Sequence, residues 1–112
     1  MTSTNSPTAA EFQVLVALAD GEKHGYAIGK EIEARTDGQV QLRAATLYTV
    51  IKRLLDNGYI DENAPRPDPD LDDERRRYYR LTPRGRKAAE VEALRLENTG
   101  RQARAKLRPR KA

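Results

Sequence analysis

Residues 43–60, RAATLYTVIKRLLDNGYI, decide the fold predicted for this chain. Apolar side chains recur there every three to four positions and form a single helical stripe: Leu47, Val50, Ile51, Leu54 and Leu55. The other sides of the same helix carry small, hydroxyl-bearing and cationic residues: Ala45, Thr46, Tyr48, Thr49, Lys52 and Arg53. Gly58 follows as a left-handed stop. The stretch therefore predicts one amphipathic helix that packs on a core through its apolar stripe.

The polar side of this helix has two interpretations. Hydroxyls and cations on a helix that starts with small residues suit a helix laid in a DNA groove, where they can donate to phosphates and base edges. An ordinary surface helix, however, also has a polar side that faces only water. The rest of the chain has to decide between the two.

Size and composition bound the answer. At 112 residues, with 38% hydrophobic and 34% charged residues, the chain predicts one domain with a modest core that a second copy would help to complete. There is no cysteine, which excludes disulfides, thiolate metal sites and cysteine nucleophiles. The first seven residues lack the charged and apolar regions of a signal peptide, and no apolar run approaches the roughly 20 residues that span a bilayer. We expect a soluble cytoplasmic protein that makes no membrane contact.

The net charge of +4 is distributed unevenly. Residues 61–74 hold seven acids and one base, a sum of −6, whereas residues 84–112 hold ten bases and three acids, a sum of +7. A basic balance of this kind favours an anionic partner, above all nucleic acid. The alternative for the last stretch is a merely solubilising tail.

The order of predicted elements gives the fold class. Helices are expected at about 8–19, with Thr8 as its N-cap, and at 25–36 and 44–57, with a brief extended segment at 39–42. Two strands at 59 onward and 75–81 follow, and then a last helix from Pro83 to at least Asn98, capped by Thr82. This order predicts a mainly α fold with a small β-hairpin, a winged helix-turn-helix followed by a long C-terminal dimerisation helix. The predicted organisation is a disordered lead at 1–7, the DNA-binding domain at 8–82, the dimerisation helix at 83–100, and a basic tail at 101–112 that can start as helix before it becomes disordered.

Two features near residue 25 support this reading. Gly25 and Gly29 cost about 1 kcal/mol each inside a helix, so they predict a close helix–helix approach. His24 is the only histidine, and with no cysteine in the chain we expect it to cap or pack at that helix start and not to bind a metal.

The chain also has no Ser/His/Asp set and no phosphate-cradling glycine loop, so we expect neither an enzyme nor a cofactor.

Three segments resemble the PadR-like transcriptional regulators: LVALADGEKHGYAIGKEIE at 15–33, ATLYTVIKRLLDNGYI at 45–60 and RRRYYRLTPRGR at 75–86. With their linkers they cover about residues 11–98, and the length resembles the short branch of the family, which has a single C-terminal helix. The resemblance implies a homodimer that binds a roughly palindromic operator, usually as a repressor. Thr49 stands where the family often has proline, and Ala44 and Ala45 stand where it commonly has a small residue and a glycine, so the groove contact can differ.

The residues expected to contact DNA lie on the focal helix, before it and in the wing: Tyr26, Ala45, Thr46, Tyr48, Thr49, Lys52, Arg53, Arg75, Arg76 and Arg77. Packing roles are the alternative for Tyr26 and Tyr48, and a surface ion pair is the alternative for Arg53. The three wing arginines could instead be neutralised by the acids at 72–74.

The last helix carries a seam at heptad spacing, built mostly from small residues: Ala89, Ala93, Leu96, Gly100, Ala103 and Leu107. We expect it to form a homodimer interface together with Phe12, Leu15 and Val16, while Val91 and Leu94 pack within the same protomer or on the first helix. A small-molecule effector at that interface is an open expectation, but the last helix has no aromatic residue to form a stacking sandwich.

The sequence thus predicts a sequence-specific DNA-binding regulator, a repressor acting as a homodimer through the helix at 44–57 and the wing at 59–81. The alternative is a winged-helix protein-interaction adapter or antirepressor that does not bind DNA directly.

Overall fold

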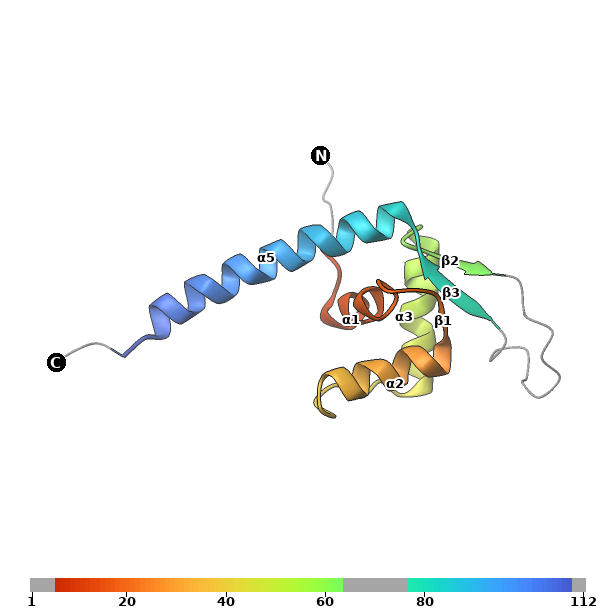
Figure 1. The fold of residues 1–112 in the computed structure, drawn as a ribbon, viewed down its shortest axis with the longest axis horizontal. Helices are drawn as coiled ribbons and strands as arrows, with labels where there is room; N and C mark the ends of the chain where they lie inside the picture. Colours follow the sequence, from red (N-terminus) through yellow and green to blue (C-terminus); the bar gives the residue numbers. More distant parts are fainter. Residues whose placement is uncertain (1–5, 64–76, 110–112) are drawn as a thin grey trace.

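A computed structural model describes residues 6–63 and 77–109 of the chain. Its elements, in order along the chain, are α1 (Ala9–Ala17), β1 (Lys23–His24), α2 (Gly25–Arg35), α3 (Ala44–Asp56), β2 (Ile60–Asn63), β3 (Tyr78–Leu81) and α5 (Pro83–Leu107) (Figure 1). The predicted fold class, mainly helical with a small antiparallel sheet, is confirmed.

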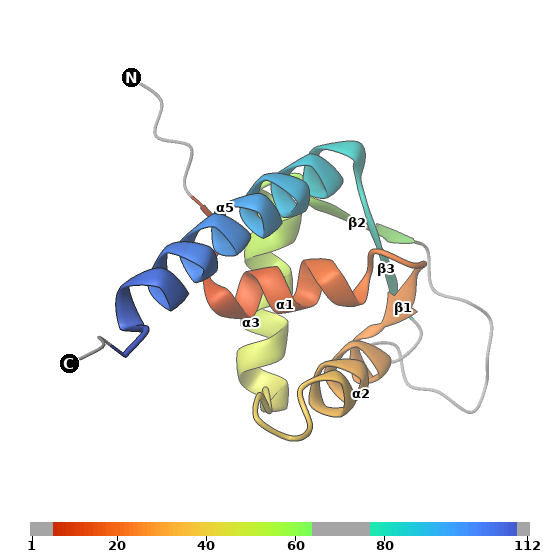
Figure 2. The same ribbon diagram turned by 60° about the vertical axis from the view of Figure 1, so that its left-hand side comes forward.

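The core lies where α1 meets α2, α3 and α5 (Figure 2). Its fully buried large side chains come from every one of the first three helices and from β2: Val14, Leu15, Leu18, Ile28, Ile32, Ile51, Leu54 and Ile60. The start of α1 is fixed by the predicted cap. The Glu11 amide donates to Thr8 Oγ1 (3.1 Å) and the Thr8 amide donates to Glu11 Oε1 (2.9 Å), so each side chain satisfies a free backbone donor of the other residue.

The sheet has three strands in the order β1–β3–β2, all antiparallel, with Lys23 opposite Tyr79 and Ile60 opposite Leu81. The two expected wing strands are confirmed as β2 and β3, but the sheet has a third strand, β1, that was not expected, and residues 39–42 are not a strand. The third strand lies before α2 and not after it. A strand of two residues has no periodicity to detect, and Lys23–His24 becomes a strand only because β3 returns beside it.

A compact junction joins the end of α3 to the start of α5. The Thr82 hydroxyl donates to the Gly58 carbonyl (2.7 Å) and accepts from the Gly85 amide (3.0 Å), which caps α5 as predicted. Gly58 has a φ of +76°, the left-handed stop expected after α3. A Cβ on Gly85 would lie 1.9 Å from the Tyr59 carbonyl oxygen, so only glycine fits this close approach.

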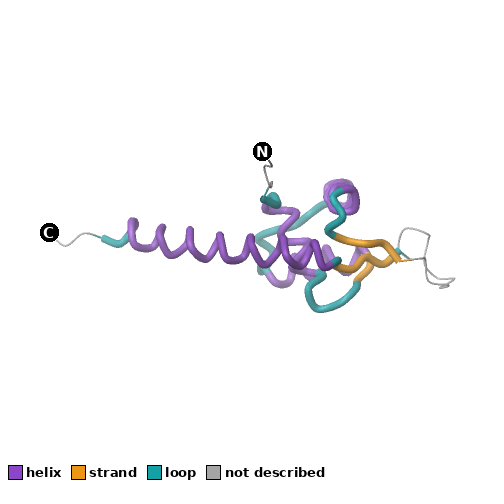
Figure 3. Tube along the Cα trace, turned by 90° about the horizontal axis from the view of Figure 1, so that it is seen from above, coloured by secondary structure: helices purple, strands orange, loops and turns teal. Residues whose placement is uncertain are grey.

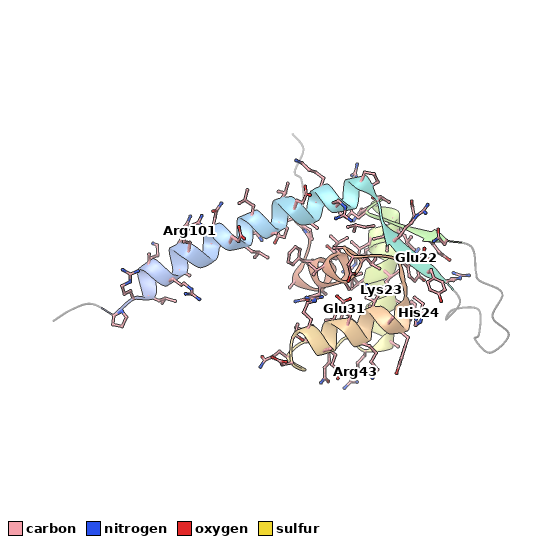
Figure 4. All side chains as sticks on the ribbon, in the orientation of Figure 1. Glu22, Lys23, His24, Glu31, Arg43 and Arg101 are labelled. Atoms are coloured by element: carbon pink, nitrogen blue, oxygen red, sulfur yellow. The ribbon has the colours of Figure 1, made fainter. Side chains whose placement is uncertain are left out.

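The loop between α1 and α2 is held by Lys23 (Figure 4). Its ammonium donates to Asp20 Oδ1 (2.6 Å) and to the Ala17 carbonyl (2.7 Å), and it lies 3.3 Å from Glu31 Oε1 on α2. Burial lowers the pKa of Lys23, but the hydrogen bonds with Asp20 and Glu31 outweigh burial and raise that pKa overall. The lysine therefore stays charged and ties α1, β1 and α2 together.

Helix α5 is 25 residues long, about 37 Å, and its second half extends well beyond the rest of the chain (Figure 3). Most of the described part of the basic segment after residue 100 is thus helical. Val91 and Leu94 are 55% and 58% exposed, so the expectation that they pack within the same protomer or on the first helix is wrong for more than half of the surface of each side chain. Among the described residues, no helix combines the length and the apolar character needed to cross a membrane.

Candidate nucleic-acid interface

Helix α3 divides into a buried and an exposed side. Leu47, Val50, Ile51 and Leu54 are at most 4% exposed and pack in the core, whereas Leu55 is half-buried. On the other side, all the expected contact residues except Tyr48 are exposed: Ala45, Thr46, Thr49, Lys52 and Arg53. Burial of the apolar stripe therefore leaves these polar side chains and Ala45 facing solvent, where a DNA groove could receive them.

The start of α3 is free to meet an anion. Arg43 occupies the N-cap position but makes no side-chain capping bond there, and Ala44, Ala45 and Thr46 are exposed. The first amides of a helix lack intrahelical acceptors and carry the positive end of the helix dipole, which suits a phosphate. This end of α3 lies away from α5, beside α2, where Arg43 adds a cation (Figures 1 and 4).

The polar side chains of α3 differ in what they can offer. Thr49 Oγ1 already donates to the Ala45 carbonyl (2.9 Å), so its hydroxyl can accept a hydrogen bond and its methyl group can meet an apolar edge. Lys52 Nζ is 3.9 Å from Asp56 Oδ2, a weak exposed pair that a phosphate could replace. No carboxylate of residues 6–63 or 77–109 forms an ion pair with Arg53. Within the described residues, Arg53 is therefore not held in the surface ion pair that was the alternative to a DNA contact.

Tyr48 is half-buried and packs against the start of α2. A Cβ on Gly25 would lie 2.3 Å from Tyr48 Oη and 2.7 Å from Cζ, so the glycine makes room for this ring, as the expected close approach requires. Gly29 is different, because a Cβ there would make only an ordinary 3.5 Å contact with Leu47 Cδ2. The packing role of Tyr48 is thus established, and a DNA contact by the same side chain stays a prediction.

A group of rings gathers at the start of α2. His24 Nδ1 accepts a hydrogen bond from the Ala27 amide (3.2 Å), which confirms the predicted cap. Its ring stacks on Tyr26 at 6.5 Å and meets Tyr78 edge-on at 5.5 Å. Tyr26 is 61% exposed, and Lys30 Nζ lies 5.4 Å from its ring centroid. Lys30 was not among the expected contact residues and adds a cation beside Tyr26. Its i+4 spacing from that tyrosine is the sequence signal that indicates this pair. No cluster of possible metal ligands occurs among the described residues.

Of the three arginines expected to contact DNA from the wing, only Arg77 belongs to the described residues. Arg77 Nε lies 3.2 Å from Glu62 Oε2, so this arginine forms an ion pair with β2, while the acids at 72–74 lie outside the described residues. Arg80 and Asp61 form a second, longer pair at 3.9 Å. Arg75 and Arg76 lie outside the described residues. Exposed pairs of this kind are worth at most about 1 kcal/mol, so a phosphate could take the place of the Arg77 partner.

The expected interface residues separate into two groups. Leu15 is 0% exposed inside the core of its own chain, and its assignment to a dimer interface is wrong because no surface of it is available. The others reach the surface at least in part: Phe12, Val16, Ala89, Ala93, Leu96, Gly100 and Ala103. Helical periodicity alone did not separate Leu15 from its neighbours, because α1 is surrounded on three sides by α2, α3 and α5.

Three helices around one core, a sheet that flanks the third of them, and an exposed polar face on that third helix define a winged helix-turn-helix protein. The family model of the transcriptional regulator PadR-like family matches residues 14–91, which is more than half of the chain. The chain belongs to the PadR-like family of transcriptional regulators.

Solved structures agree with this assignment. The chain is similar to a transcriptional regulator from Clostridium thermocellum, with 31% identity over 89% of this chain and 90% of that chain and a TM-score of 0.72. It also has the fold of Bacillus subtilis PadR in a complex with operator DNA, at 21% identity over 75% of this chain and 46% of that chain, with a TM-score of 0.65. An uncharacterized protein of Lysinibacillus sphaericus is 36% identical over 74 residues, which are 65% of this chain and 64% of the length of that relative.

Proposed function

We propose that the chain is a sequence-specific DNA-binding regulator that acts in the cytoplasm as a homodimeric repressor on a roughly palindromic operator. The observation that carries the proposal is the exposed face of α3, where five expected contact residues lie away from the buried leucine, valine and isoleucine side chains of the apolar stripe. An α-helix fits the major groove, and this face combines phosphate donors with small residues that allow close approach.

The proposed dimer follows from α5. Its seam packs against α1 near the start of the helix but continues onto the half that extends away from the domain, where Leu96 is 43% and Leu107 is 80% exposed. Small residues between these leucines would let two such helices approach closely. Because α5 and the start of α3 lie on opposite sides of the domain, pairing through α5 would leave the recognition helix of each protomer uncovered (Figure 1).

The test is a salt titration of binding to the promoter fragment upstream of the gene for this chain. A dimer that neutralises about eight phosphates should show log K falling against log salt with a slope near −7. The variant Lys52→Gln should weaken binding and reduce that slope by about 2, because each protomer loses one phosphate contact. Asp56→Asn is the matched control, since it removes only the partner of Lys52 and should leave the affinity unchanged or slightly higher.

The adapter or antirepressor alternative gives the opposite results. If the exposed face of α3 meets a protein, the chain will not bind its promoter fragment with a steep salt dependence, and Lys52→Gln will leave the slope unchanged. The first result would overturn the proposed DNA-binding function, and the second would place the DNA contact elsewhere than at Lys52.

A further inference from the structure

A hollow of about 300 Å³ lies away from the exposed face of α3, between the segment that leads into α1 and the first turns of α5. Its apolar lining comes from Pro7, Tyr59, Ala88 and Val91, and its cations are Arg84 and Lys87. Cavities that bind small molecules begin at about this volume and are mostly apolar with a few convergent polar groups. The dimensions and the lining of the hollow therefore suit a small ligand.

The charges around the hollow are not balanced. Among the described residues no carboxylate pairs with Arg84 or Lys87, and the Arg84 guanidinium lies 5.4 Å from the centroid of the Tyr59 ring. Both cations also stand in the first turns of α5, where the helix dipole disfavours positive charge. An anion bound between them would relieve both sources of repulsion.

The one acid at the hollow does not supply that anion. Glu92 is 4% exposed, and Arg95 donates to both of its carboxylate oxygens, at 2.9 Å from Nε and 2.5 Å from Nη2. The hydrogen bond from Arg95 lowers the pKa of Glu92 against the opposing effect of burial, so the pair remains ionised. Glu92 is thus neutralised by its own partner and leaves Arg84 and Lys87 unmatched.

We propose that this hollow binds a small organic anion with an aliphatic body, a short-chain to medium-chain carboxylate. Arg84 and Lys87 hold the carboxylate, and the chain lies against Ala88, Val91 and Pro7. The Tyr59 ring is already covered on one face by Arg84, so the remaining apolar lining is aliphatic and favours a chain over a second stacked ring.

The site stays open in the proposed dimer. Successive residues of an α-helix are rotated by about 100°, which places the hollow face of α5 (84, 87, 88 and 91) roughly 150° from its seam (89, 93, 96, 100 and 103). A partner that packs on the seam therefore does not cover the hollow, and the site is distinct from a pore between protomers. The Tyr59 backbone carbonyl accepts a hydrogen bond from the Thr82 amide (3.1 Å), and Tyr59 directly follows Gly58, the stop of α3. A ligand on the Tyr59 ring therefore touches the junction between α3 and α5.

Octanoate and octylamine, which have the same number of carbon atoms and opposite charges, are the probes for this site. Titrations of the full chain by isothermal calorimetry and by amide NMR shifts should show saturable binding of octanoate, with shifts at the start of α5 and around Tyr59, and no comparable binding of octylamine. Lys87→Met and Arg84→Gln keep most of the side-chain stem and should each weaken octanoate binding about tenfold, the cost of one charge-assisted contact. Val91→Asp should abolish it.

Lys106→Met is the matched control, because it removes a cation from the far end of the same helix and should leave the affinity unchanged. Circular dichroism of each variant establishes that the fold is intact, which is expected because the four substituted side chains are exposed. Equal binding of octanoate and octylamine would overturn the proposal, and so would unchanged octanoate affinity in folded Lys87→Met and Val91→Asp. None of these readouts requires DNA, so failure of the site is distinguishable from failure of the proposed DNA binding.

Discussion

Replacing Gly85 with alanine tests the junction that positions α3 against α5. In most helices a glycine-to-alanine change is stabilising, by about 1 kcal/mol, because alanine is the better helix former. At Gly85 the added Cβ would lie 1.9 Å from the Tyr59 carbonyl oxygen and 2.8 Å from its carbonyl carbon. Both are backbone atoms, so no change of rotamer can relieve the overlap, and α5 or the end of α3 has to move.

The magnitude follows from the contacts that such a movement breaks. Overpacking in a tight site costs about 1–3 kcal/mol. A displaced first turn also weakens the cap in which the Gly85 amide donates to Thr82 Oγ1, and a lost cap costs about 1 kcal/mol. After subtraction of the better helix propensity of alanine, Gly85→Ala should lower the free energy of unfolding by roughly 1–3 kcal/mol.

Gly29→Ala is the matched control. It also places alanine in a helix, but its Cβ would make only an ordinary contact, 3.5 Å from Leu47 Cδ2. This variant should raise the free energy of unfolding by about 0.5–1 kcal/mol, so the two variants should differ by roughly 1.5–4 kcal/mol.

Urea unfolding followed by circular dichroism measures both variants. All samples need the same protein concentration, since the stability of a dimer depends on it. If Gly85→Ala is as stable as the unsubstituted chain, the junction relaxes without cost and the argument fails. Equal destabilisation by both substitutions would show that the contact with Tyr59 is not the cause.

Three further predictions use the same chain. Thr82→Ala should cost about 1–2 kcal/mol of unfolding free energy in urea unfolding, because the hydroxyl both caps α5 and donates to the end of α3, and Thr82→Ser should restore most of it; equal losses would contradict the hydroxyl role. Arg95 lowers the pKa of Glu92, so this carboxylate stabilises the fold above its ordinary value of 4.5 and loses that effect as the pH falls through the lowered value. Glu92→Gln should therefore be less stable at neutral pH and should show a flatter fall in urea midpoint between about pH 5 and 3; an identical acid limb would count against this. Leu96→Lys, on the seam of α5, should convert the proposed dimer into monomers in size-exclusion chromatography with light scattering, whereas Leu94→Lys on another face of that helix should not, and the same elution for both variants would place the interface elsewhere.

The structural roles that could be predicted from the sequence are those that depend on a local pattern of residues. The stripe from Leu47 to Leu54, the stop at Gly58 and the caps at Thr8, His24 and Thr82 all lie where spacing and residue type place them. Periodicity, capping and left-handed stops depend on a few neighbouring residues, so they can be recognised in the sequence without knowledge of any tertiary contact. The division of α3 into a buried and an exposed face was predictable for that reason.

Other features depend on which distant segments meet, and spacing along the chain does not encode that. Lys23–His24 is a strand only because β3 lies beside it, and Leu15 is buried because three other helices surround α1. Helical periodicity predicts a close helix–helix approach at both Gly25 and Gly29, but only Gly25 faces the Tyr48 ring. The sequence by itself determined where each helix begins and which of its sides is apolar, because those properties follow from local backbone geometry. Tertiary structure alone decided which apolar residues are buried in the core, which glycine makes room for the Tyr48 ring, and which cations stand beside a hollow. Each of these results from packing between segments far apart in the chain.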